Sequence, residues 1–266
     1  MYKFYLLESA FSQVGVDRLQ ANLIELNEAM VSYPSPTDEY FYSNTFWDVL
    51  VAQNVTMTQC LYCLPNQQFC RVILPLVLKK LHIIDQINDY TGLCRTFPKD
   101  INAFWGVVFT PKNKYDLSTK TELSQFRYNA AKNNVSHATF KRFKSVLFKK
   151  IVFCDSAYQY LASYSPAEFN QIISRLLELD RYNQTWSQGV FAPSHVTLGS
   201  NLKVSYESTT TNNNPKLSAL RWFKLPDGRK EYFEPHIKMG NMRIHFFPDN
   251  NNHTIYVGYI GPHLPV

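Results

Sequence analysis

Basic and titratable side chains alternate with apolar residues along three segments near the end of the chain. His236 and Lys238 take every second position of one segment, Arg243 and His245 do so in the next, and Tyr256 follows in the third. Successive side chains of a β-strand point to opposite faces, so these groups would share one face of a sheet. Imidazoles transfer protons near neutral pH, and cations stabilise the negative charge that develops on a reacting phosphate. The pattern indicates a phosphodiester-cleaving face; an ordinary solvated face is the alternative.

The elements that must position these groups form an antiparallel meander. Four strands are predicted, over Arg221–Leu225, Lys230–Met239, Met242–Pro248 and Thr254–Ile260. Turn-forming residues separate them, for example Pro-Asp-Gly after the first strand. One face of this sheet is apolar and should pack on a helix, which leaves the basic face open.

A helix to cover the apolar face is predicted over Pro166–Leu179, after a short strand at Lys150–Phe153. Ser165 is a good N-cap, and Glu168 stands three residues later, as in a capping box. The segment Gly199–Pro215 is rich in Ser, Thr and Asn, and we expect a mobile loop or hairpin arm there.

This order of strand, amphipathic helix and antiparallel sheet resembles the RelE/HigB-type toxin superfamily over residues 149–266. The stretch Met242–Asp249, an arginine followed by alternating apolar residues and an acidic turn, is similar to the third-strand phrase of that family. The resemblance implies a curved antiparallel sheet packed on helices. It also implies a metal-independent endoribonuclease that acts usually on ribosome-bound messenger RNA. The Gly199–Pro215 insertion departs from the compact family pattern.

The resemblance also suggests roles for single residues. Lys238 matches the basic residue of the second strand, and Arg243 matches the arginine that opens the third. His236, Tyr256 and His263 occupy places where the family has an acid or base. Attack of a ribose 2′-hydroxyl on the neighbouring phosphate needs a proton acceptor, a proton donor and positive charge, which such groups supply without a cofactor.

Residues 1–148 are predicted to form a separate, mostly helical domain that positions or restrains the C-terminal one, so that the whole chain is α+β. Helices are expected behind Asp17, over Phe46–Asn54, over Gln68–Leu81 and over Thr121–Lys150 with a break near Asn133, and strands over Tyr2–Leu7 and Asn102–Thr110.

Charge favours a polyanionic partner. The net charge is +6, and the stretch from Leu123 to Cys154 has basic residues but no acidic one. A stretch of this kind can neutralise nucleic-acid phosphates, although a solvated helix face is an equally good explanation. The candidate nucleic-acid contacts are Arg127, Lys132, Lys141, Arg142 and Lys144, together with Arg221 and Lys224 on the first strand of the meander.

Composition narrows the class of protein. Hydrophobic residues make up 45% and charged residues 18% of the chain, which is enough to bury a core. No apolar run approaches the roughly 20 residues that span a bilayer, and no secretory signal is visible. Five cysteines in 266 residues favour a reducing compartment, so we expect a cytoplasmic protein with no membrane partner.

A zinc site is the main alternative use of the cysteines. Cys60 and Cys63 have the spacing of half a structural zinc site, with Cys70 and Cys94 further on. The second half lacks paired spacing, and buried free cysteines are common, so we expect no metal.

Together these features predict a toxin or defence effector that cleaves RNA, with the ribosome and an antitoxin or gating protein as further partners. The alternative is a non-catalytic subunit that binds nucleic acid or protein within a larger complex.

Overall fold

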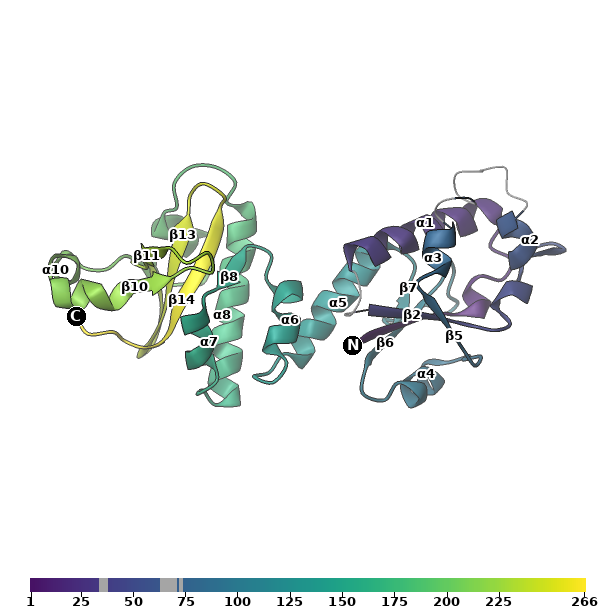
Figure 1. Cartoon of the computed structure of the whole chain (residues 1–266), viewed down its shortest axis with the longest axis horizontal. Coiled ribbons are helices and arrows are strands. Elements are labelled where there is room, and N and C mark those ends of the chain that lie inside the picture. Colours follow the sequence, from purple (N-terminus) through teal and green to yellow (C-terminus); the bar gives the residue numbers. More distant parts are fainter. Residues whose placement is uncertain (34–37, 63–70, 72–73) are drawn as a thin grey trace. The chain divides into compact units, whose positions relative to one another are not determined.

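The computed structural model describes residues 1–33, 38–62, 71 and 74–266, and these form two compact units, Met1–Ala130 and Ala131–Val266 (Figure 1). The boundary between the two units lies at residues 130 and 131, before residue 148, where the sequence analysis placed it. Helix α6 (Phe140–Leu147) belongs to the second unit, because the ring of Phe140 packs edge-on against Phe153 and Phe169 of that unit.

The first unit is built on a five-stranded sheet in the order β5-β2-β1-β6-β7, in which every pairing is parallel. Its strands are β1 (Tyr2–Leu6), β2 (Asp38–Ser43), β5 (Leu81–Ile84), β6 (Ile101–Trp105) and β7 (Asp116–Leu117). The first strand therefore lies in the centre, as in doubly wound α/β domains. Its helices are α1 (Val16–Ser32), α2 (Met57–Tyr62), α3 (Leu74–Leu78), α4 (Tyr90–Thr96) and most of α5 (Lys120–Asn134).

The expectation of a mostly helical first domain is therefore not confirmed, because a parallel sheet forms the centre of this unit. Strands of a parallel sheet are buried on both faces and lack the alternation that marks a strand in sequence. The predicted helix over Phe46–Asn54 is instead a short 3₁₀ turn, Phe46–Asp48, followed by the hairpin β3 (Leu50–Ala52) and β4 (Val55–Thr56). The helix predicted over Gln68–Leu81 lies partly outside the described residues, and α3 covers only its later part.

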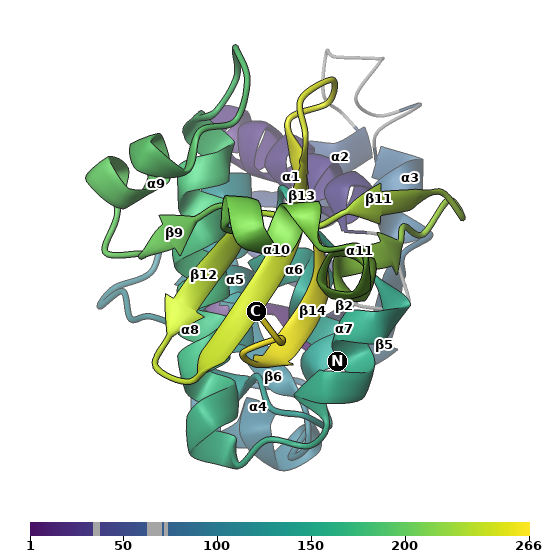
Figure 2. The ribbon, with the colours of Figure 1, turned by 90° about the vertical axis from the view of Figure 1, so that its left-hand side faces the viewer.

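The second unit contains a sheet in the order β8-β14-β13-β12-β9 (Figure 2). Strands β9, β12, β13 and β14 pair antiparallel with their neighbours, whereas β8 is parallel to β14. The strands are β8 (Ile151–Phe153), β9 (Val204–Ser205), β12 (His236–Met239), β13 (Met242–Asp249) and β14 (Thr254–Pro262). The antiparallel sheet predicted from alternation is thus confirmed.

One predicted strand of the meander is divided. Lys230–Met239 separates into β11 (Lys230–Tyr232), which forms a two-stranded sheet with β10 (Trp222–Lys224), and β12, which joins the main sheet. Pro235 stands at the break, where its missing N–H cannot contribute to a ladder.

Helix α8 (Pro166–Thr185) begins as predicted. Ser165 and Glu168 form a reciprocal capping box, and Pro166 occupies the first turn. The helix lies across one face of the sheet (Figures 1 and 2) and buries Phe169, Ile172 and Leu176. Helix α7 (Asp155–Leu161) precedes it, and α9 (Pro193–Gly199) follows.

The Gly199–Pro215 segment is not a loop without structure. Its strand β9 pairs with β12, and it continues into α10 (Thr209–Asn213) and α11 (Pro215–Ser218). Two of the Ser and Asn residues that suggested mobility are helix caps: Ser208 accepts a hydrogen bond from the Thr211 N–H, and Asn214 caps α11.

Among the helices of the described residues, none has both the length and the apolar character required to cross a membrane.

Candidate functional site

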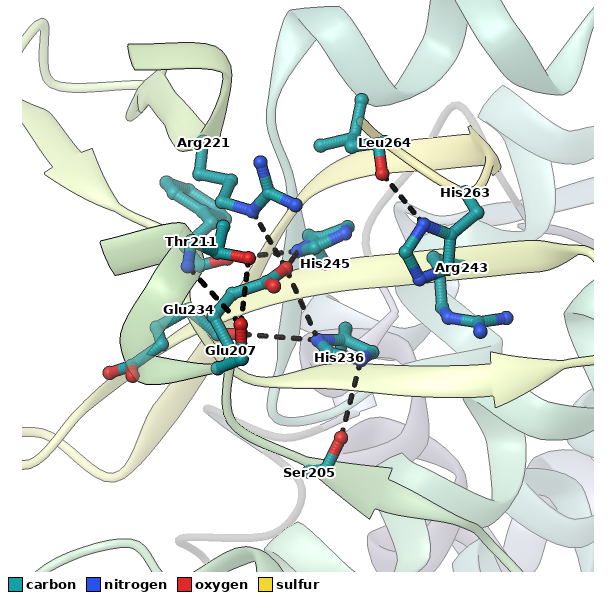
Figure 3. A network of polar contacts seen from close by, with 12 residues as sticks. Ser205, Glu207, Thr211, Arg221, Glu234, His236, Arg243, His245, His263 and Leu264 are labelled. Atoms are coloured by element: carbon teal, nitrogen blue, oxygen red, sulfur yellow. Dashed lines mark hydrogen bonds and ion pairs between the residues drawn. The ribbon is translucent and has the colours of Figure 1, made fainter. Parts of the chain in front are cut away.

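Two of the sheet-face histidines are buried. His236 on β12 and His245 on β13 are register partners, with ring centroids 4.9 Å apart. They are 5% and 1% exposed, because the segment between β9 and α10 covers this part of the sheet (Figure 3). The expected open face is therefore closed at these two positions.

The covering segment contributes Glu207, a residue that the sequence did not single out. Its Oε1 lies 3.6 Å from His236 Nδ1 and 3.9 Å from His245 Nδ1. The same oxygen lies 2.7 Å from Nε of Arg221, whose side chain is fully buried. Figure 3 shows these four side chains converging from the segment between β9 and α10, the 3₁₀ turn Ala219–Arg221 before β10, and strands β12 and β13. We call Glu207, Arg221, His236 and His245 the buried cluster.

Burial sets the charge of the two imidazoles. Loss of water lowers the pKa of His245 to about 3, and the neighbouring His236 contributes to that shift. Burial also lowers the pKa of His236, although Glu207 opposes that shift. Both rings are consequently neutral near pH 7, and their Nδ1 atoms lie 3.3 and 3.0 Å from the backbone oxygens of Glu234 and Phe233. The charges of Glu207 and Arg221 balance each other.

The buried cluster has the ligand types of a metal site, since two imidazoles and a carboxylate lie within 4.8 Å of one another. Arg221 argues against this use. Its guanidinium already neutralises Glu207 and is itself buried, so a divalent ion there would add uncompensated positive charge inside the protein. The cluster fits a buried ion pair flanked by two neutral imidazoles better than a metal centre.

The zinc site considered from the sequence involves four cysteines, none of which belongs to the buried cluster. Cys63 and Cys70 lie outside the described residues. Cys60 is buried and Cys94 is half-buried, and neither belongs to a metal-ligand group of the described part of the chain.

Three of the predicted catalytic residues do come together on the open part of the sheet. Lys238 and Arg243 are register partners on β12 and β13, one exposed and the other half-buried. Arg243 donates to the backbone oxygens of Gly240 and Met242, which holds its guanidinium near the β12–β13 turn. His263 follows β14 and is exposed, and its backbone N–H donates to the Asn241 oxygen at 2.9 Å, which places it near Arg243 on the neighbouring strand.

Tyr256 does not belong to this group. It pairs with Phe247 at the far end of β13, whereas Arg243 pairs with Gly261. The strand from Tyr256 to Gly261 extends over about 17 Å at the usual rise. The ring packs with Phe247 against the core cluster around Phe233, so Tyr256 is a structural residue.

A cavity of about 830 Å³ opens between α8 and the β12–β13 turn. Four cationic residues line it, and none of its described lining residues is acidic: Arg175, Lys203, Lys238 and Arg243. Glu178 contacts Arg175 from outside the lining at 3.4 Å. Arg175 and Lys203 are not among the residues predicted from the sequence. Arg175 lies on α8 outside the apolar stripe formed by Phe169, Ile172 and Ile173. That position was the signal in the sequence that its side chain is accessible.

Two predicted nucleic-acid contacts are core residues instead. Arg221 belongs to the buried cluster. Arg127 on α5 is 2% exposed, pairs with Asp38, and lies between the rings of Tyr2 and Tyr33 at 4.3 and 4.1 Å from their centroids. The stretch around Arg127 has no acidic residue nearby in the sequence, but Arg127 pairs with Asp38, which lies on the distant strand β2.

The remaining basic candidates are accessible. Lys132, Lys141, Arg142 and Lys224 are exposed. Lys144 is half-buried, and its ammonium group contacts the hydroxyl of Tyr158.

Searches against protein-family models, curated proteins and solved structures return no significant match to the chain.

Proposed function

We propose that the second unit is a RelE-like domain that binds RNA at the cationic cavity and cleaves it, without a metal, on the adjoining open face. The observation that carries the proposal is the lining of the cavity: Arg175, Lys203, Lys238 and Arg243 converge with no lining acid. Clustered cations repel one another unless an anion lies among them, and a phosphodiester backbone supplies one. The resemblance to RelE/HigB toxins favours RNA as the polyanion.

The chemistry would use the three open residues. A ribose 2′-hydroxyl loses its proton as its oxygen bonds to phosphorus, and the bond from phosphorus to the 5′-oxygen breaks. His263 is the imidazole available on this face to accept that proton and to return it to the departing 5′-oxygen, since His236 and His245 are buried. Lys238 and Arg243 would stabilise the charge that develops on the phosphorane. The products are a 2′,3′-cyclic phosphate and a 5′-hydroxyl.

Such an activity suits a cytoplasmic toxin or antiviral defence effector. Ribosome-bound messenger RNA is then the substrate, and an antitoxin or gating protein restrains the enzyme. The first unit, Met1–Ala130, is available to bind that partner.

A non-catalytic RNA-binding subunit is the second candidate, and the buried cluster favours it. Burial of His236 and His245 removes two of the imidazoles that an acid–base pair would need.

The deciding experiment incubates purified full-length protein with RNA, alone and with translating ribosomes, in EDTA. Cleavage that yields 2′,3′-cyclic phosphate ends, and that a 2′-deoxyribose at the scissile position abolishes, supports the enzyme. Loss of cleavage in EDTA or 3′-hydroxyl ends would exclude the metal-free mechanism. Binding without any cleavage, lost in Arg175→Gln/Lys203→Gln but kept in Lys99→Gln, identifies the binding subunit. Lys99 is an exposed lysine of the first unit, between α4 and β6, and serves as the control.

A further inference from the structure

The β10–β11 hairpin presents two aromatic rings and two lysines on a single face. Trp222 pairs with Tyr232 in the register, and Lys224 pairs with Lys230. Since side chains alternate along a strand, all four lie on the same side of this two-stranded ribbon. We call them the aromatic–lysine face. The opposite side carries Phe223, whose ring packs 5.2 Å from Phe233 in the core.

Neither ring is used to build the core. Trp222 is 51% exposed, and its ring lies 5.6 Å from that of Tyr232. The Tyr232 hydroxyl donates to Asn212 Oδ1 at 2.5 Å, which fixes the orientation of its ring. A large, half-exposed indole beside an anchored phenol is a rigid surface on which a planar ligand can stack.

The lysines require a negatively charged partner. Like charges directly opposite each other on two strands are destabilising. The acids of the hairpin do not relieve this, because Asp227 and Glu231 pair with Arg229 at 2.8 and 3.3 Å. Glu231 pairs with Phe223 in the register and so lies on the other side of the ribbon. Lys224 and Lys230 are both exposed.

We propose that the aromatic–lysine face binds unpaired bases of single-stranded RNA, which stack on Trp222 and Tyr232 while Lys224 and Lys230 contact the flanking phosphates. Sites that bind single strands usually combine aromatic side chains, on which any base can stack, with cationic side chains that contact the nucleic-acid backbone. The inference rests on the proposed function, because the same RNA would occupy the cationic cavity.

The two sites lie toward opposite edges of the sheet. Hairpin strand β10 contacts β14, whereas the cavity is lined from β12 next to the edge strand β9. Figure 2 shows β11 on the side of β14 and β9 on the other. A strand that occupied both sites would therefore extend from one side of the sheet to the other.

The test measures the affinity of the full chain for a uridine oligonucleotide and for the same backbone with abasic positions. Trp222→Leu should weaken binding of the uridine strand about 5- to 100-fold. It should leave the abasic strand unaffected, and Trp222→Phe should retain most of the affinity. Lys224→Gln/Lys230→Gln should weaken both strands. The controls are Tyr62→Ala, which removes a ring 74% exposed in the first unit, and Lys99→Gln.

The outcomes separate the two proposals. If the wild-type protein binds neither strand, the proposed function fails and the stacking site fails with it. If it binds RNA, and Arg175→Gln/Lys203→Gln weakens that binding while Trp222→Leu changes nothing, the cavity stands and the aromatic–lysine face is overturned. Equal losses for the uridine and abasic strands in Trp222→Leu would also overturn base stacking.

Discussion

Glu207 and Arg221 form an ion pair of 2.7 Å with side chains 5% and 0% exposed, and this pair closes the sheet face over His236 and His245. Arg221 also donates to the backbone oxygens of Leu217 and Pro265. The pair therefore fastens the inserted segment and the C-terminal tail to the sheet.

Removing one partner of this pair should destabilise the second unit. Glu207→Gln leaves the Arg221 charge buried without a counter-ion, which typically costs about 3–5 kcal/mol in the free energy of unfolding. Urea unfolding measures this, and limited proteolysis should then cut within Gly199–Pro215, which wild-type protein should protect. Asp227→Asn, which breaks an exposed pair, is the control and should have no measurable effect. If Glu207→Gln and wild type resist urea and protease equally, the Glu207–Arg221 pair does not hold the Gly199–Pro215 segment in place.

Stability of the second unit should fall as the pH falls. The folded pKa of His245 is about 3, below its ordinary value of about 6.5, so the unfolded chain binds more protons between these limits. The stabilising contribution is complete above pH 6.5 and is lost progressively down to pH 3. Unfolding measured across this window should show a smaller slope for His245→Gln than for wild type. An unchanged slope would mean that His245 titrates normally.

His263 and His236 should differ in their effect on RNA cleavage. His263→Asn should lower the rate by roughly 10²–10⁴, because His263 is the open imidazole beside Arg243. Arg243→Ala should lower it by about 10²–10³, because it removes the charge that the proposed mechanism directs at the phosphorane. His236→Asn should change stability rather than the rate per folded molecule. A pH–rate profile of folded protein checks this, and a large loss of rate in His236→Asn alone would show that the buried cluster opens to react.

The basic residues of the helical stretch should divide into two classes. Lys141→Gln and Arg142→Gln should each weaken RNA binding, because each removes a charge that can neutralise a phosphate. Each should also flatten the salt dependence of binding by up to about 0.7 log unit on a single strand. Salt titration of RNA binding measures both effects. Unchanged slopes would leave these residues as a solvated face.

Arg127→Gln is the matched contrast. It should destabilise the first unit, because Asp38 would remain buried without its partner, and it should not change the affinity for RNA. Thermal unfolding and the same salt titration measure the two effects. Weaker RNA binding with unchanged stability would place Arg127 on the interface.

The sequence by itself determined those helices and strands of the second unit whose signals lie within a few consecutive residues. The capping box of Ser165 and Glu168 marks the start of α8, and the alternation along β12 and β13 identifies the antiparallel strands and the faces of Ile237 and Ile244. Caps and alternation act over a few residues, so they can be recognised without knowing the fold.

Only the tertiary structure decided which polar groups meet. Glu207 lies far from His236 and His245 in the chain, and the pairing of β9 with β12 brings it over them. Arg127 likewise meets Asp38 across the first unit. A side chain's partner and burial depend on non-local pairing, which leaves no periodic trace in the sequence. For this reason the sequence could propose His236 as an open catalytic base, and the fold placed it in a neutral, buried cluster.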